Sequence, residues 1–249
     1  MELLRRPRRA AKWVRRNLRL SAEEVSFEYR RSRVRALRGV SFAVDGRCVG
    51  LLGPNGAGKS TLMSLLTGAL APQSGAVGVD GAPGVIGFVP QDLRIDPHLS
   101  CEEFLAYCAW LRKLPSRSWA AETARVLEAL HLTDRRREKV GSLSGGLRRR
   151  LAVAQALLGD PGVVVLDEPT SALDPAQRRS LLDLVGVIKD QVGVVLSTHL
   201  IEDVVAVADA IVVLDQGTVV WDGPLGQVAP GPDRAGQLES FFLSVTGQG

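Results

Sequence analysis

A glycine-rich segment between an apolar run and a helical pattern constrains the fold of this chain more than any other feature. Residues 53–60 read Gly-Pro-Asn-Gly-Ala-Gly-Lys-Ser, which satisfies the pattern GxxxxGK[ST]. Cys48–Leu52 predicts a buried strand before this segment, and residues 60–67 predict a helix after it. The glycines let the backbone turn so that several N–H groups point at one phosphate group, and the positive end of the helix adds to them. The sequence therefore predicts a site for a nucleoside triphosphate.

Two side chains of this loop carry groups that suit a bound triphosphate. Lys59 supplies a mobile positive charge for the β- and γ-phosphates, and the Ser60 hydroxyl is a ligand that Mg²⁺ accepts. Only five of the 31 basic residues are lysines, so a lysine at this position stands out against a strong preference for arginine. The alternative is an ordinary glycine turn before a helix, and the flanking strand and helix patterns count against it.

Beyond the loop, the chain alternates strand and helix patterns. Residues 25–29 and 40–44 predict edge strands, whereas residues 100–130 have helical periodicity without strand patterns and predict a separate helical lobe. Short β-branched runs bounded by turn residues are typical of buried parallel strands, and they occur at 85–89, 162–166, 193–197 and 210–214. The expected fold class is therefore α/β with a helical insertion.

Composition excludes several classes of protein. A chain of 249 residues that is 45% hydrophobic can bury a substantial core and is too apolar to be wholly disordered. It holds no run approaching the roughly 18 uncharged apolar residues needed to cross a bilayer. Its three cysteines lack the spacing of metal ligands and predict reduced thiols; Cys101 and Cys108 lie on one face of a predicted helix, as core or boundary residues.

The positive charge is concentrated in an N-terminal arm. Residues 1–20 hold eight basic residues and one acidic residue, a net charge of +7; because the whole chain carries +4, the other 229 residues carry −3. A nucleic-acid-binding face on the body, and hence a nucleic-acid partner, is not expected. The arm has apolar residues near one helical face, which suits an anionic membrane surface, although Pro7 interrupts the pattern. An unstructured arm is the alternative.

Acidic and imidazole side chains follow two of the predicted strands. The run Val-Val-Val-Leu at 163–166 ends in Asp167 and Glu168, and the strand at 193–197 is followed closely by His199. Ligands of parallel sheets bind at the carboxyl ends of the strands, so these side chains are expected beside the phosphate loop. Asp167 is predicted to hold Mg²⁺, and Glu168 to act as the general base toward the attacking water.

A second glycine segment, Leu-Ser-Gly-Gly-Leu at 143–147, opens another predicted helix. Ser144 is the expected N-cap, and Gly145 and Gly146 leave free N–H groups beside it. Arginines at positions 148–150 crowd the first turns, where cations oppose the helix dipole. Two interpretations remain open: a solvated basic face, or an anion bound at this helix end that offsets the repulsion.

Taken together, these motifs resemble the ATP-binding subunit of an ABC transporter over residues 25–223. Seven elements occur in the family's order: Tyr29 before the first loop, the Walker A loop at 53–61, the Q-loop Gln91, the signature at 143–146, Walker B at 163–168, the D-loop at 171–174 and the switch histidine His199. The resemblance implies a P-loop NTPase with a RecA-like core, an antiparallel β edge subdomain and an inserted α-helical subdomain.

The same resemblance implies the roles of individual residues. Tyr29 would stack on adenine, and Gln91 would touch Mg²⁺ while sensing a membrane partner. Ser144, Gly145 and Gly146 would bind the γ-phosphate held by a second subunit, Asp174 would cross the dimer interface, and His199 would hold the γ-phosphate and the attacking water. The residues implied to bind ATP in the Walker A loop are Gly53, Pro54, Asn55, Gly56, Ala57, Gly58, Lys59, Ser60 and Thr61.

One position departs from the family pattern. The fifth signature residue is Leu147 where the family usually has glutamine, which removes one hydrogen bond near the ribose, a loss of about 1 kcal/mol. An apolar residue there is frequent in the ABC-2 branch of multidrug and antibiotic exporters, and the Leu-Glu-Ser-Phe-Phe run at 238–242 resembles the end of such subunits. A terminal amphipathic helix is the plainer interpretation of that run.

The resemblance divides the chain into an arm (1–20), a RecA-like core with a β subdomain (21–91 and 157–225), a helical signature subdomain (92–156) and a C-terminal tail helix (226–249). The expected function is ATP hydrolysis that powers export through a separate membrane permease, by a homodimer or heterodimer around two ATP molecules with Mg²⁺. The expected location is cytoplasmic, at the inner face of the cell membrane. A soluble ABC ATPase of cofactor or cluster assembly and an importer ATPase remain the alternatives.

Overall fold

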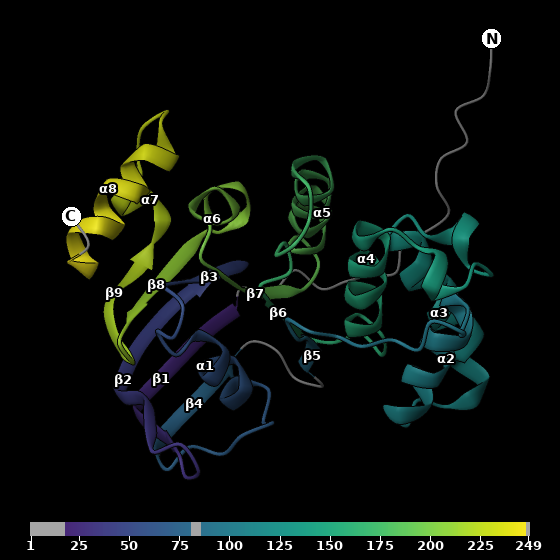
Figure 1. Ribbon diagram of the computed structural model, residues 1–249, viewed down its shortest axis with the longest axis horizontal. Coiled ribbons are helices and arrows are strands. Elements are labelled where there is room, and N and C mark those ends of the chain that lie inside the picture. The colour runs from purple at the N-terminus through teal and green to yellow at the C-terminus, as the bar shows by residue number, and fades with distance from the viewer. Residues whose placement is uncertain (1–17, 81–85, 248–249) are drawn as a thin grey trace.

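Two sheets of different kinds organise the protein, a computed structural model of which describes residues 18–80 and 86–247. The larger sheet has the strand order β5-β6-β7-β3-β8-β9, and only β9 runs antiparallel to its neighbour (Figure 1). Its strands are β3 (Cys48–Leu52), β5 (Ile86–Val89), β6 (Val163–Asp167), β7 (Gly193–Thr198), β8 (Ala210–Asp215) and β9 (Thr218–Pro224). Strand β3 therefore lies between β7 and β8, inside the sheet.

The smaller sheet is antiparallel and has the order β2-β1-β4. Its strands are β1 (Leu18–Tyr29), β2 (Val34–Gly46) and β4 (Ser74–Asp80). The predicted segments 25–29 and 40–44 lie in this separate sheet, as expected of an antiparallel β subdomain. Strand β1 begins at Leu18 and so takes up the last residues of the range 1–20 assigned to the arm. Strands β4 and β9 were not predicted.

Helices cover the larger sheet and build the inserted lobe. Helix α1 (Lys59–Leu66) follows the glycine-rich loop, and the lobe contains α2 (Cys101–Leu111), α3 (Trp119–Ala129) and α4 (Gly145–Ala156), with 3₁₀ turns at Ser116–Ser118, Thr133–Arg135 and Val140–Ser142. The remaining helices are α5 (Pro175–Ile188), α6 (Ile201–Val207), α7 (Leu225–Val228) and α8 (Arg234–Thr246). Within the described ranges, no helix is long and apolar enough to span a membrane.

Local sequence explains where these helices begin. Ser100 and Glu103 form a reciprocal capping box at the start of α2, with each side chain bonding the backbone N–H of the other residue. Asp174 caps α5 and Pro175 occupies its first turn, where the missing N–H of proline costs no helical bond. The capping residues thus fix the start of the helical lobe and the start of α5.

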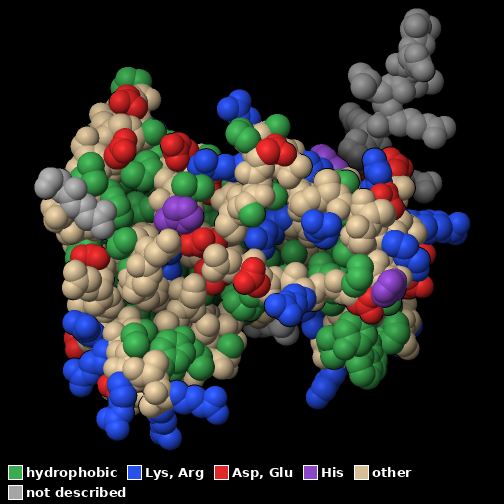
Figure 2. Space-filling model, in the orientation of Figure 1, with side chains coloured by type: hydrophobic (Ala, Val, Ile, Leu, Met, Phe, Trp, Pro, Cys, Tyr) green, Lys and Arg blue, Asp and Glu red, His purple; other side chains and the backbone are tan. Residues whose placement is uncertain are grey.

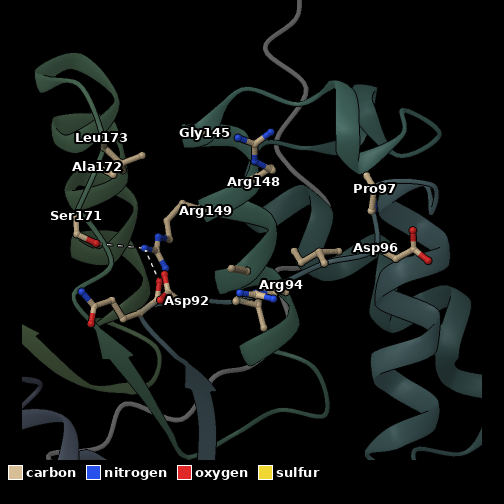
Figure 3. A pocket seen from close by; sticks show the side chains of 14 residues that line it. Asp92, Arg94, Asp96, Pro97, Gly145, Arg148, Arg149, Ser171, Ala172 and Leu173 are labelled. Atoms are coloured by element: carbon tan, nitrogen blue, oxygen red, sulfur yellow. Dashed lines mark hydrogen bonds between the residues drawn. The ribbon is translucent and has the colours of Figure 1, made fainter.

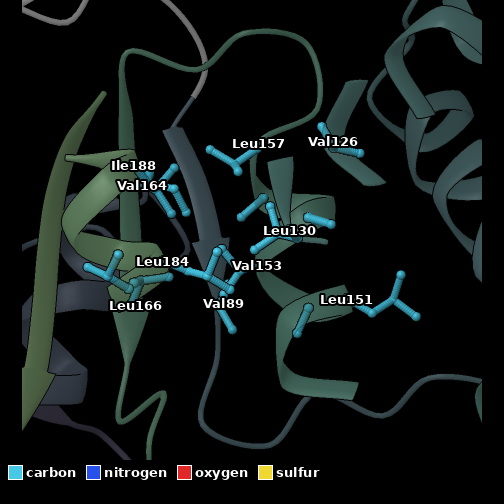
Figure 4. Close-up of a cluster of buried hydrophobic side chains, with 14 of the residues drawn as sticks. Val89, Val126, Leu130, Leu151, Val153, Leu157, Val164, Leu166, Leu184 and Ile188 are labelled. Carbon is cyan, nitrogen blue, oxygen red and sulfur yellow. The ribbon is translucent and has the colours of Figure 1, made fainter. Parts of the chain in front are cut away.

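Alternation along the strands divides the core into two layers. In β6, Val164 and Leu166 belong to one hydrophobic cluster, and Val163 and Val165 belong to another on the opposite face. The first cluster joins the sheet to α5, α4 and the helical lobe (Figure 4). The second packs the sheet against α1 and the antiparallel sheet. The lobe is therefore continuous with the core and is not a loosely tethered module.

The cysteines lie where the sequence predicts. Cys101 is buried and Cys108 is half-buried on α2, and Cys48 is buried in β3. Burial raises the pKa of Cys48 to about 12 and that of Cys108 to about 11, so both thiols stay protonated near neutral pH.

Surface charge is uneven over the described residues. Basic side chains gather at the lower left of Figure 2, where Figure 1 places the turn between β1 and β2. Arg30, Arg31, Arg33 and Arg35 are all exposed there. The mildly acidic body therefore carries a local basic tip.

Candidate functional site

The glycine-rich loop occupies the connection from β3 to α1, and steric crowding explains two of its glycines. A Cβ added at Gly53 would lie 2.3 Å from the carbonyl oxygen of Leu214. Gly58 has φ +105, and its added Cβ would lie 2.6 Å from the carbonyl oxygen of Ala36. The loop is therefore wedged between β8 and the antiparallel sheet, in a path that side chains cannot follow.

Lys59 opens α1 and turns its side chain back over the loop. Its Nζ donates to the carbonyl oxygens of Gly53 at 2.7 Å and Pro54 at 3.1 Å, and it lies 4.0 Å from Oε1 of Glu168. Burial lowers the pKa of Lys59, and the nearby carboxylates of Glu168 and Asp167 oppose that shift. A desolvated ammonium held by carbonyl oxygens is well suited to exchange them for phosphate oxygens.

A cavity of about 450 Å³ lies in front of this loop. Tyr29, Val34 and Ala36 of the antiparallel sheet line it at one side, and Lys59, Ser60 and Thr61 line it together with Gln91 and Glu168. The Tyr29 hydroxyl lies 3.2 Å from Oγ1 of Thr61, and its ring packs edge-on against Phe27 while remaining 40% exposed. The cavity thus offers an aromatic surface to one part of a ligand and a cation to another.

Glu168 stands where β6 ends and is held in a left-handed conformation, with φ +42. Its backbone N–H donates to Oγ of Ser197 at 3.0 Å, and the same hydroxyl donates to the carboxylate of Asp167. Ser197 thereby fixes both predicted acids from the neighbouring strand β7. Such a backbone is unusual for a residue other than glycine and is held here by the surrounding bonds.

The carboxylate of Glu168 collects the other predicted side chains. Gln91 Nε2 donates to its Oε2 at 3.3 Å, and His199 Nδ1 lies 3.3 Å from its Oε1. With Lys59 at 4.0 Å, four groups from four segments of the chain meet at one point. The expectation that they lie together at the carboxyl ends of the strands agrees with this geometry.

Ser144 and Asp174 lie apart from that cluster. Ser144 caps α4 by accepting from Leu147 N at 3.4 Å, and Asp174 caps α5 by accepting from Gln177 N at 2.9 Å. Among the described residues, neither these two nor Gly145 and Gly146 line the cavity of Lys59. The signature segment of one chain therefore does not complete that chain's own loop.

The three arginines after the signature bind acceptors of their own chain. Arg148 Nη1 donates to Leu143 O at 2.8 Å, and Arg150 Nη2 donates to Ser180 Oγ at 2.6 Å. Arg148 is exposed and Arg150 is half-buried, so both side chains reach solvent while they bond to acceptors of their own chain. These bonds tether the first turns of α4 to the preceding loop and to α5.

Sequence reasoning did not single out Arg149 individually. In the structure its side chain connects α4 to the loops that follow Gln91 and Glu168. Its guanidinium donates to Pro90 O at 3.3 Å and to Gln91 O at 3.1 Å, and it reaches Ser171 Oγ at 3.5 Å (Figure 3). Burial lowers its pKa, while Asp92 and Asp167 oppose the shift. Together with Gly145, it lines a second cavity of about 700 Å³ between α4 and the loops after Gln91 and Glu168.

A family model and individual similar proteins both indicate the ABC transporter family. Residues 37–171 match the ABC transporter family. The chain is 37% identical to the ABC transporter ATP-binding protein YxlF of Bacillus subtilis over 231 residues, which cover 91% of this chain and 76% of YxlF. It is 34% identical to the linearmycin resistance ATP-binding protein LnrL of Bacillus subtilis, over 82% of this chain and 68% of LnrL.

An import protein and a solved structure are also similar. The molybdenum import ATP-binding protein ModC of Brucella abortus is 36% identical, over 76% of this chain and 56% of ModC. The structure of CbiO1 from Clostridium perfringens, part of the ABC transporter complex CbiONQ, superposes with a TM-score of 0.72 and 26% identity. That match covers 89% of this chain and 98% of CbiO1.

Proposed function

Because this chain belongs to the ABC transporter family, as an ATP-binding subunit that hydrolyses ATP, we propose that it powers export of a substrate through a separate membrane permease. The observation that carries the catalytic part of the proposal is the meeting of Lys59, Gln91, Glu168 and His199 at the cavity in front of the loop. The permease, and a place at the inner face of the membrane, belong to the same proposal.

The geometry supports a division of labour in hydrolysis. Lys59 offsets the charge of the β- and γ-phosphates while Tyr29 takes the adenine end of the cavity. The oxygen of a water molecule attacks the γ-phosphorus, the bond to the bridging oxygen breaks, and the Glu168 carboxylate accepts the proton from that water. His199 orients Glu168 and the water, with its Nδ1 at 3.3 Å from Oε1.

The donor set at this site fits Mg²⁺. Within the described residues no group of three His, Cys, Asp or Glu side chains gathers as a metal site, and Mg²⁺ bound to a nucleotide needs only one or two protein ligands besides phosphate oxygens. Ser60, Asp167 and Gln91 carry the oxygen atoms that would hold it, either directly or through its bound water. When bound, the ion supplies positive charge that stabilises the β- and γ-phosphate oxygens.

Two chains are proposed to enclose two ATP molecules. Each chain has one glycine-rich loop and one signature segment, and the signature lies outside the cavity of Lys59. In a second copy or a homologous subunit, Ser144 and the N–H groups of Gly145 and Gly146 would complete the γ-phosphate site, with Asp174 at the interface. The first N–H groups of an α-helix have no partner within the helix, so those at the start of α4 suit this purpose.

Two sequence features and the name of one relative favour export over import. The apolar Leu147 and the run at 238–242 match the exporter branch, and LnrL is named for resistance to linearmycin. The import protein ModC keeps the second direction open as the alternative. Inside-out vesicles that carry the complex would distinguish them, since export predicts ATP-dependent uptake of amphipathic antibiotic probes and import predicts none.

The catalytic proposal is tested by Glu168→Gln. The amide keeps the size of the side chain but cannot accept the proton, so ATP should bind with near-normal affinity while steady-state hydrolysis falls at least about 100-fold. Filter binding of labelled ATP and phosphate release would measure the two effects. Steady-state hydrolysis near the wild-type rate in this variant would contradict the general-base role.

The transport proposal is tested by affinity capture of the tagged chain from detergent-solubilised membranes of its host. A multi-helix membrane protein at near-equal stoichiometry is expected. Recovery of soluble partners only, or of the chain alone, would favour the soluble assembly ATPase. The basic arm was assigned to residues 1–20, of which 18–20 belong to β1 and 1–17 lie outside the described residues. The proposed contact of the arm with anionic lipid predicts that a chain lacking residues 1–17 binds anionic vesicles less tightly at low salt.

A further inference from the structure

Asp203 is a fully buried carboxylate to which the hydrolysis scheme assigns no role. It lies in the first turn of α6 with 0% of its surface exposed. Its Oδ2 accepts from the hydroxyl of Thr170 and from the hydroxyl of Thr198 at 3.3 Å, and its Oδ1 accepts from Nε of Arg178. A buried carboxylate is tolerated only when paired in this way, so these bonds are strongly held.

The two threonines stand beside the two proposed catalytic side chains. Thr170 is two residues after Glu168, and Thr198 directly precedes His199. The Thr198 hydroxyl also accepts from the backbone N–H of Leu200 at 3.0 Å, so His199 lies between two bonded residues. One carboxylate therefore anchors the loop of the general base and the loop of the histidine to the same point.

The left-handed backbone of Glu168 is strained, and the bonds around it hold it in that conformation. Its left-handed backbone is fastened on the N-terminal side by the bond from its N–H to Ser197. On the C-terminal side, Ser171 N donates to Glu168 O at 3.2 Å, and the Thr170 hydroxyl fixes the turn to Asp203. The Glu168 carbonyl oxygen also accepts from Ser171 Oγ at 2.9 Å, so loss of the Thr170 bond removes one of several restraints on this turn and lets the turn shift the carboxylate slightly.

We propose that Asp203 is a positioning residue for ATP hydrolysis, which holds the Glu168 carboxylate and the His199 imidazole together through Thr170 and Thr198. The inference rests on the proposed roles of Glu168 and His199. It differs from a purely structural role, in which the Arg178–Asp203 pair would only join α5 to α6. Displacing a reacting group by a fraction of an ångström lowers the rate of chemistry far more than it lowers binding.

Thr170→Val and Thr198→Val test the proposal without removing the carboxylate. Each keeps the branched shape, removes one hydroxyl and leaves Arg178 bonded to Asp203. Each should lower kcat at least about 10-fold and change KM for ATP less than about twofold, because only the transition state depends on the position of the base. Thr170→Ser and Thr198→Ser retain the hydroxyl and should restore most of kcat.

Thr123→Val is the matched control. Thr123 is a buried threonine of α3 whose hydroxyl has no hydrogen-bond partner among the described residues, so its loss should leave kcat and KM unchanged. Thermal unfolding of all variants checks that they fold. Equal kcat losses in Thr123→Val and Thr170→Val would overturn the proposal, as would a rise in KM with kcat unchanged.

A double-mutant cycle identifies the side chain through which Thr198 acts. In single turnovers, Thr198→Val combined with His199→Gln should hydrolyse ATP about as slowly as His199→Gln alone. Fully additive losses would overturn the link to His199. The proposed function fails separately: if Glu168→Gln hydrolyses ATP normally, the catalytic assignment falls, whereas normal kcat in both valine variants beside an inactive Glu168→Gln removes only the role of Asp203.

Discussion

At Gly53 and Gly56, the space around a single Cα decides what each position tolerates. A Cβ at Gly53 would meet a backbone carbonyl oxygen at 2.3 Å, whereas a Cβ at Gly56 would meet nothing within 4 Å. Gly56 has φ +84, so its substitution carries conformational strain alone. Glycine is therefore favoured at Gly56 by backbone conformation and at Gly53 by lack of space.

Alanine at these two positions should consequently give different results. Gly56→Ala should lower the free energy of unfolding by about 1 kcal/mol, the usual cost of a left-handed alanine, and leave ATP affinity within a few fold. Gly53→Ala must displace the loop or β8 and should weaken ATP binding at least about 10-fold. Fluorescent-nucleotide titration and urea unfolding measure both effects, and equal loss of affinity in the two variants would show that crowding at Leu214 is unimportant.

Sequence reasoning predicted the site residues that belong to a recognisable motif or that directly follow a predicted strand. Lys59 and Ser60 are set by the loop, and Asp167, Glu168 and His199 follow strand ends. Ser197, Arg149 and Asp203 have no such pattern, because each acts by contacting segments distant in the sequence. Their partners depend on how strands and helices pack, which periodicity does not encode.

At the scale of elements, one carboxylate fastens the sheet near the start of β3. Asp209 accepts from the N–H groups of Arg47 at 3.0 Å and Cys48 at 2.9 Å, and from the Lys189 ammonium at 2.9 Å. Burial alone would raise the pKa of Asp209, but the Lys189 and backbone hydrogen bonds outweigh it and lower that pKa. The strand that leads to the phosphate loop is thus tied to the start of β8 and the end of α5.

Asp209→Asn should therefore destabilise the protein in a pH-dependent way. Because the folded pKa is depressed, the carboxylate contributes stability above its unfolded pKa of about 4 and loses it as pH falls through the folded value. The variant should lose about 2 kcal/mol at pH 7.5, and the gap from wild type should narrow in acid. Urea unfolding at pH 7.5 and at several pH values below about 4 tests this, and a pH-independent difference would contradict it.

Strand prediction succeeded for the buried parallel strands rich in β-branched side chains, but it missed β4 and also β9, although β9 begins Thr-Val-Val. The buried strands β6, β7 and β8 were located within about one residue because valine, isoleucine and leucine dominate them. Strand β4 reads Ser-Gly-Ala-Val-Gly-Val-Asp, and its two glycines hide its tendency to pair. It exists because β1 offers an antiparallel partner, which is a tertiary cause.

At the scale of the whole molecule, the signature lies outside the cavity of Lys59, which is the basis of the proposed assembly. If a second copy completes the γ-phosphate site as proposed, the chain should bind that copy only when ATP is present. We expect Glu168→Gln to elute with ATP at twice the 26.7 kDa of one chain and without ATP at 26.7 kDa. Light scattering after size-exclusion chromatography reads the mass, and Ser144→Arg, which blocks the start of α4, is the control that should stay monomeric.

Strand order could not be read from the sequence. Strand β3 comes first among the parallel strands along the chain and lies between β7 and β8, so two strands, β6 and β7, separate it from β5, the next parallel strand in the sequence. The α/β class and the inserted helical lobe were predictable from pattern, whereas the arrangement that gathers Glu168 and His199 beside Lys59 follows from that strand order.

The left-handed backbone of Glu168 also bears on how this protein can evolve. Glycine adopts that conformation freely, so a drift from glutamate to glycine would relieve the backbone while removing the group that accepts the proton. Selection for stability of the fold would therefore favour glycine at position 168, whereas selection for ATP hydrolysis favours glutamate. A library of variants enriched only for heat resistance should accumulate changes at this position, and the survivors would be inert.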